Sequence, residues 1–99
     1  MDRPSIILSN KAKIKLFKIL EFYAERNKSN SFSIKLYQRI NKEIRKLRDH
    51  PNIGINTDSE MIKALIVDNY LIYYEFTNEY IVIHTIWNSR QNPENLKIT

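Results

Sequence analysis

Cysteine is absent from this 99-residue sequence, and glycine occurs once, at Gly54. Without cysteine the chain can form neither a disulfide nor a thiolate metal site. A single glycine excludes the glycine-rich phosphate loops of Rossmann and Walker-type nucleotide sites. No segment approaches the roughly 20 apolar residues of a membrane span, and the apolar run at residues 6–8 is too short for a signal-peptide core. We therefore expect a cytoplasmic protein with no metal, no cofactor and no membrane contact.

The remaining composition is that of an ordinary globular chain, with 42% hydrophobic and 27% charged residues. Its length predicts a single domain over residues 1–99. The net charge of +5 is unevenly placed, because residues 1–50 hold 13 Lys and Arg against 5 Asp and Glu, whereas residues 51–99 hold 3 against 6. Such asymmetry indicates an acidic partner for the first half, either nucleic acid or an acidic protein segment, or a solvated lysine-rich helix surface.

The first half shows the spacing of a strand followed by two amphipathic helices. Residues Ser5 to Leu8 predict a short strand, and Ser9 or Asn10 can cap the helix after it. A second helix opens at Ser31 or Ser33 after a polar loop. The apolar positions recur at helical spacing, at Ala12, Leu16, Ile19, Leu20 and Tyr23 in the first helix and at Leu36, Ile40, Ile44 and Leu47 in the second.

The second half changes to the composition of strands. Three runs rich in Ile, Val, Tyr and Phe predict strands over Glu60–Val67, Tyr70–Phe76 and Tyr80–Trp87. Asp68-Asn69 fits a two-residue hairpin turn, and residues 77–79 fit a slightly longer one.

These elements predict an α+β fold. An N-terminal strand leads into a helical hairpin, and a three-stranded antiparallel meander packs on the helices. The first strand can add at an edge of the sheet, and the face away from the hairpin is expected to be open. The polar tail at 88–99 is predicted to be extended or partly disordered.

Four stretches in this order resemble the RelE/ParE toxin superfamily, over about Ile6 to Leu96. The stretch IILSNKAKIKLFKILEFY is similar to the family's first strand and the helix after it. The stretch KEIRKLRDHP is similar to the end of the family's second helix. The stretch IKALIVDNYLIYYEF is similar to the family's central hairpin. The stretch YIVIHTIWNSRQNPENL is similar to its last strand and the Arg-x-x-Pro segment after it. The resemblance implies the same α+β fold and the toxin of a type II toxin–antitoxin pair, with a cognate antitoxin as partner.

The superfamily contains two activities, and the resemblance leaves both open. ParE-like members poison DNA gyrase without being nucleases, whereas RelE-like members cleave mRNA within the ribosome without a metal. A diverged member that retains only antitoxin binding is a third interpretation. The resemblance also leaves open whether the chain forms a homodimer or a toxin–antitoxin hetero-oligomer.

The residues favour the ParE-like interpretation. Metal-free RNA cleavage needs a base, an acid and cations that stabilise the charged phosphorane. Leu71 stands where nuclease members often carry Arg, and Ile62 and Ala64 stand where some carry Lys. The sequence also ends without the terminal His or Tyr of such nucleases. We therefore expect inhibition by binding, with gyrase as the target and ribosome-bound mRNA as the alternative.

Two residues remain as weak catalytic candidates. His84 can act as acid or base, and period-two alternation places it on one strand face with Tyr80, Val82 and Ile86. Glu75 can act as a base and shares a face with Tyr73 and Leu71. A lone histidine on such a face is more often structural, and a glutamate there is more often a solvated strand residue.

The candidates for target or partner binding lie in or beyond the strands. Arg90 stands first, because arginine grips a phosphate or carboxylate with two hydrogen bonds. Asn92 can pin the tail beside it, and Lys63 supplies a second cation. Trp87 and Tyr73 offer aromatic surface for a base or an antitoxin groove, and both are also explained as packed aromatics.

A further cationic feature lies on the second helix. Lys35, Arg39, Lys42 and Lys46 fall at offsets of four, three and four, so they form one stripe. The stripe can follow a phosphate backbone, meet an acidic antitoxin segment or face water. It carries no interleaved aromatic for base stacking, which favours water or the antitoxin.

Overall fold

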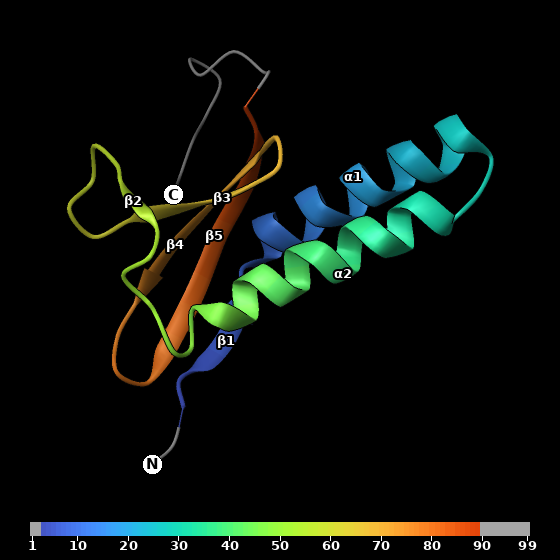
Figure 1. Cartoon of the computed structure of the whole chain (residues 1–99). Helices are drawn as coiled ribbons and strands as arrows, with labels where there is room; N and C mark the ends of the chain where they lie inside the picture. Colours follow the sequence, from blue (N-terminus) through green and yellow to red (C-terminus); the bar gives the residue numbers. More distant parts are fainter. Residues whose placement is uncertain (1–2, 90–99) are drawn as a thin grey trace.

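The computed structural model describes residues 3–89 and shows a five-stranded sheet with a helical hairpin on one face (Figure 1). The elements in chain order are β1 (Ser5–Leu8), α1 (Asn10–Asn27), α2 (Ser31–Lys46), β2 (Ile55–Asn56), β3 (Lys63–Val67), β4 (Tyr70–Phe76) and β5 (Tyr80–Asn88). The strands lie in the order β1-β5-β4-β3-β2. The predicted N-terminal strand, helical hairpin and antiparallel β3-β4-β5 meander are therefore confirmed.

β1 takes the predicted edge position, and it makes the sheet mixed because it runs parallel to β5. The pairing ends where Leu8 lies opposite Ile83. Ser9 then closes it, since its N–H donates to the Ile83 carbonyl at 3.0 Å and its Oγ donates to the His84 carbonyl at 2.7 Å. Ser9 Oγ also accepts from the Ala12 N–H at 3.0 Å as the predicted cap of α1. On this side no described strand accompanies β5 beyond Ile83.

The helices pack on the sheet through the two predicted apolar stripes. Leu36, Ile40, Ile44 and Leu47 of the second stripe are all buried. Ser33 Oγ donates to the Leu20 carbonyl at 2.7 Å and ties α2 to α1. Arg39 donates to both carboxylate oxygens of Asp68 at 2.8 Å, so one cation of the predicted stripe is held against the β3–β4 turn. Asp68 takes the positive φ, 53°, that this hairpin turn requires.

The strand predicted from Glu60 begins at Lys63, and β2 was not predicted at all. The preceding residues turn instead, because the Thr57 hydroxyl contacts the Ile62 carbonyl at 2.7 Å and the Ser59 carbonyl at 3.1 Å. The Ile62 N–H also donates to the Ser59 carbonyl. Two-residue β2 lacks the length and alternation that mark a strand in sequence.

A β-bulge in β5 corrects the predicted faces of that strand. Tyr73 pairs with Thr85, but the next residue, Tyr74, pairs with Ile83, so His84 is the extra residue. The alternation therefore slips, and His84 does not share a face with Ile86 as predicted. Ile86 joins the core under the helices, whereas His84 lies on the outer face with Glu75.

The apolar residues form one large and one small cluster. The large cluster lies between the sheet and the helical hairpin and includes the fully buried Ile72, Tyr74, Ile81 and Ile83. The small cluster lies on the outer face and consists of Ile62, Ala64, Tyr73 and Trp87 with Leu71 against it. The outer face is thus less open than predicted, because Tyr73 and Trp87 are each 7% exposed.

Candidate functional site

The predicted site residues are distributed over three places. Arg90 and Asn92 lie outside the described residues. Lys63 begins β3, beside the edge strand β2, where its Nζ donates to Asn56 Oδ1 at 2.9 Å, and β4 separates β3 from β5. Tyr73 and Trp87 lie on the outer face of β4 and β5, the strands that also carry the two catalytic candidates.

The structure brings His84 and Glu75 into direct contact. His84 Nε2 lies 2.7 Å from Glu75 Oε1, and their side chains are 19% and 34% exposed. The bulge makes the contact, because it turns His84 toward the neighbouring strand. Nearby, the Thr85 hydroxyl is buried without a hydrogen-bond partner among the described residues. Burial raises the pKa of Tyr73 above that of an ordinary phenol, so its hydroxyl stays protonated at neutral pH.

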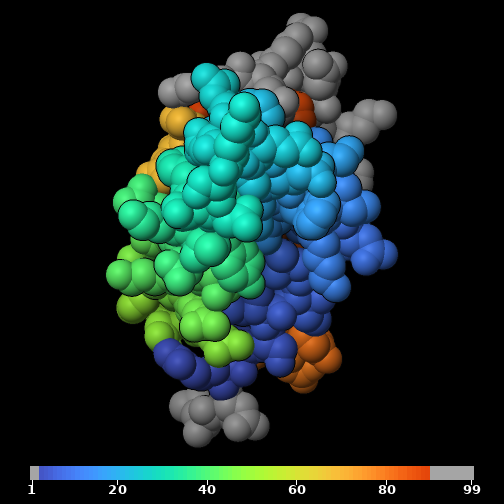
Figure 2. Space-filling view, turned by 90° about the vertical axis from the view of Figure 1, so that its right-hand side faces the viewer, coloured from blue at the N-terminus to red at the C-terminus, as the bar shows by residue number. Residues whose placement is uncertain are grey.

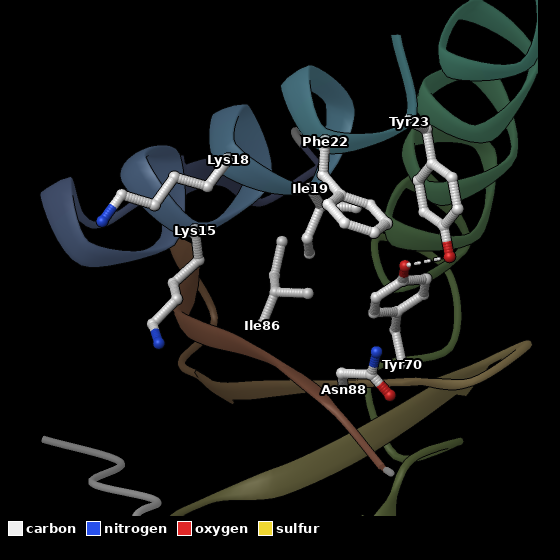
Figure 3. A pocket seen from close by; sticks show the side chains of 8 residues that line it. All are labelled: Lys15, Lys18, Ile19, Phe22, Tyr23, Tyr70, Ile86 and Asn88. Carbon is white, nitrogen blue, oxygen red and sulfur yellow. Dashed lines mark hydrogen bonds between the residues drawn. The ribbon is translucent and has the colours of Figure 1, made fainter. Parts of the chain in front are cut away.

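A hollow of about 320 Å³ opens where α1 crosses the last part of β5 (Figure 3). It is lined by Lys15, Lys18, Ile19, Phe22, Tyr23, Tyr70, Ile86 and Asn88. Figure 3 shows the Ile19 and Phe22 side chains pointing from the helix toward Ile86. The Tyr70 hydroxyl lies 3.5 Å from that of Tyr23, across the gap between helix and sheet.

Cations lie on the α1 side of the apolar floor that Ile19, Phe22 and Ile86 form. Lys15 and Lys18 stand one turn apart, and the Lys15 Nζ lies 5.3 Å from the centre of the Trp87 ring. The Arg26 guanidinium lies 5.9 Å from the centre of the Phe22 ring. Lys15 thus connects the hollow with the outer-face cluster around the end of β5. The arrangement can hold an apolar side chain flanked by carboxylates.

Residues 6–93 match the protein family described as "ParE toxin of type II toxin-antitoxin system, parDE". The chain belongs to this family. Among solved structures it is similar to a chain described as "Chromosomal ParDE TA system from P. aeruginosa", with a TM-score of 0.74 and 18% identity. The match covers 87% of this chain and 96% of that one, and at this identity it shows a shared fold. A comparison with curated proteins gave no significant match.

Membership in the ParE family makes the chain a type II toxin and implies a cognate antitoxin. No helix among residues 3–89 is long and apolar enough to cross a membrane. The same residues contain no group of three or more His, Cys, Asp or Glu that could hold a metal ion.

Sequence reasoning did not foresee that α1 lines a hollow in this ParE family member. It left Lys15 and Lys18 outside the core stripe, and it did not single out Phe22. One signal was available, since these residues recur at offsets of three and four and therefore share a helix face. The spacing does not show that this face of α1 lies over Ile86 and Asn88, some 65–70 residues later in the chain.

Proposed function

We propose that this toxin arrests growth by binding DNA gyrase and that it does not cleave RNA. One observation carries the proposal: on the outer face of the sheet the two acid–base candidates, His84 and Glu75, bind each other. Cleavage requires separate acid and base groups and a cation at the phosphorane. Among residues 51–89 the one basic side chain apart from histidine is Lys63. It lies on β3 beside Asn56, and β4 separates β3 from the strand of His84.

Gyrase supercoiling and ribosome-dependent mRNA cleavage, measured with the purified chain, test this proposal. We expect supercoiling to fall with rising toxin concentration and mRNA to remain intact. The variant His84→Gln should inhibit to within about twofold of the unmodified chain, because inhibition by binding needs no acid or base at the His84–Glu75 contact. Normal supercoiling with mRNA cleavage that His84→Gln abolishes would establish the RelE-like alternative. Neither activity, with antitoxin binding intact, would indicate the diverged member.

We further propose that the antitoxin docks in the hollow between α1 and β5. Its apolar floor and lysine rim fit an acidic segment that presents an apolar anchor, and protein interfaces combine a buried apolar centre with a polar rim. Beyond Ile83, no strand among residues 3–89 pairs with this edge of β5, and the edge lies beside the same hollow. An extended segment could therefore pair with the strand while it fills the hollow.

Two phenylalanines on α1 provide a matched test of the docking site. Phe22 lines the hollow and is 53% exposed, whereas Phe17 is 64% exposed and does not line it. We expect Phe22→Ala to weaken binding of the product of the neighbouring antitoxin reading frame about tenfold, as an anchor residue does. Phe17→Ala should leave the affinity unchanged. Calorimetric titration measures both, and equal effects of the two variants would place the antitoxin elsewhere.

A further inference from the structure

A second hollow, of about 450 Å³, lies where α2 ends against the start of the chain. It is lined by Arg3, Lys42, Arg45, Lys46, Arg48 and Asp49. Figure 2 shows the first described residues, in dark blue, against the yellow-green segment that follows α2. Five cations and one carboxylate therefore meet at one place, although 38 residues separate Arg3 from the next of them in the sequence.

The few acidic groups here are already engaged. Asp49 is bound by the Arg3 guanidinium, and this hydrogen bond holds the pKa of Asp49 below its usual value. Lys46 pairs with Glu43 at 3.0 Å, one turn away on α2. Among residues 3–89 the carboxylates near the hollow therefore already have cationic partners, and the Asp49 charge also acts on Arg48. The described lining keeps an excess of positive charge.

Three of the cations make no ion pair and no side-chain hydrogen bond with any described residue. They are Lys42, Arg45 and Arg48. Lys42 and Arg45 are exposed and stand one turn apart on α2. Arg48 is half-buried, and its Nε is shielded from solvent without a hydrogen-bond partner in the described part of the chain. The exposed donors of Lys42 and Arg45 are therefore available to an anion.

The lining distinguishes a phosphate partner from a protein partner. Protein interfaces have centres that are depleted of charge and contain apolar anchors. Among the residues that the structure describes, no apolar residue lines this hollow. Nucleic-acid interfaces are strongly positive, and most of their hydrogen bonds go to phosphate and sugar. Arginine forks match phosphate oxygens with two hydrogen bonds. The hollow between α1 and β5, with its apolar floor, has the opposite character.

The hollow continues into the cationic stripe of α2. Lys35 and Lys46 are 11 residues apart, so the stripe is about 16 Å long at 1.5 Å per residue. That length can follow several nucleotides at about 3.4 Å of axis each. The stripe lacks aromatics, which disfavours stacking on single strands but not contact with the backbone of a duplex. Within the stripe Arg39 is paired with Asp68, and Lys46 is paired with Glu43. Lys35 and Lys42, together with Arg45 of the hollow, are therefore the cations that remain for a phosphate backbone.

We propose that the α2 stripe and the hollow at its end bind the phosphate backbone of double-helical nucleic acid without reading its sequence. The inference does not depend on the docking of an antitoxin beside β5. This surface is separate from the site beside β5, and through it the toxin can bind a nucleic acid that its target also binds.

The test is fluorescence anisotropy of the full-length chain with a labelled 20-base-pair DNA duplex at several salt concentrations. We expect the double variant Lys42→Gln/Arg45→Gln to bind at least tenfold more weakly at low salt. The slope of log affinity against log salt should shrink by about 2, since each phosphate contact contributes about 0.9. Both residues are exposed, so the variant should fold. A matched control, Lys13→Gln/Arg26→Gln, removes the same charge from exposed positions on α1 and should change binding less than threefold.

Several outcomes would overturn the proposal. Equal losses in the two double variants would show attraction by net charge alone. Absence of duplex binding, with binding of an acidic polyglutamate peptide that the α2 variant loses, would make this face a protein-docking surface. Binding of short polyphosphate but of no duplex would identify a free anion as the ligand. Comparable binding of an RNA duplex would support backbone recognition, and preference for DNA would identify DNA as the source of the phosphates.

Discussion

Replacing Gly54 with alanine is expected to lower the free energy of unfolding by about 2–5 kcal/mol. The added Cβ would lie 2.6 Å from Tyr74 Oη, 2.7 Å from Tyr74 Cε1 and 3.0 Å from the Ala64 carbonyl oxygen. Tyr74 cannot retreat, because it is fully buried and its hydroxyl donates to the Pro51 carbonyl at 2.6 Å. Overpacking alone costs about 1–3 kcal/mol. The same hydroxyl accepts from the Gly54 N–H at 3.0 Å, and losing a buried hydrogen bond adds about 1–3 kcal/mol.

Thermal unfolding followed by circular dichroism measures this effect, and a shift of about 4–8 °C accompanies each kcal/mol in a domain of this size. Asn52→Ala is the control, since Asn52 is exposed in the same loop and should change stability by less than about 0.5 kcal/mol. The double variant Gly54→Ala/Tyr74→Phe should lose less than the sum of its single variants, because both changes act on one contact. An unchanged melting temperature for Gly54→Ala would show that Tyr74 does not pack here.

Replacing Ile40 with alanine is the second change for which we expect a large effect, about 2–5 kcal/mol of lost stability. Ile40 is 1% exposed in the cluster between α2 and the sheet, so its truncation leaves a cavity. Ile34 lies on the same helix and is 54% exposed. Ile34→Ala should be nearly neutral, because it removes little buried surface and alanine favours the helix.

Denaturant titration of the two isoleucine variants separates burial from helix propensity. Both changes are chemically identical and lie in one helix, so helix propensity cancels in the comparison. Ile40→Ala should move the midpoint strongly at constant slope, and Ile34→Ala should not. Similar shifts for both would mean that the buried face of α2 is assigned wrongly.

The candidate site was predictable in part. Sequence reasoning placed function at the end of β5, and the hollow beside Ile86 and Asn88 lies there. It singled out Trp87, whose ring lies against Lys15 of this hollow, but it could not supply Lys15 and Phe22 from α1. It also placed His84 on the same face as Ile86. The β-bulge interrupts the alternation of faces between these two residues, and nothing in the sequence marks the bulge.

The sequence by itself determined both helices and every strand except the two-residue β2, because periodicities of 3.6 and 2 and the cap at Ser9 are local properties. It also determined the antiparallel order of β3, β4 and β5, since two short turns allow no other pairing. Only the tertiary structure decided the parallel edge of β1, the contact of His84 with Glu75 and the gathering of Arg3 with the end of α2. The need for the single glycine, Gly54, was also decided by the tertiary structure. Its φ is not positive, and a side chain is excluded because the Tyr74 ring, 20 residues later, occupies the place of a Cβ. Contacts between distant residues depend on packing in three dimensions, and no local pattern records them.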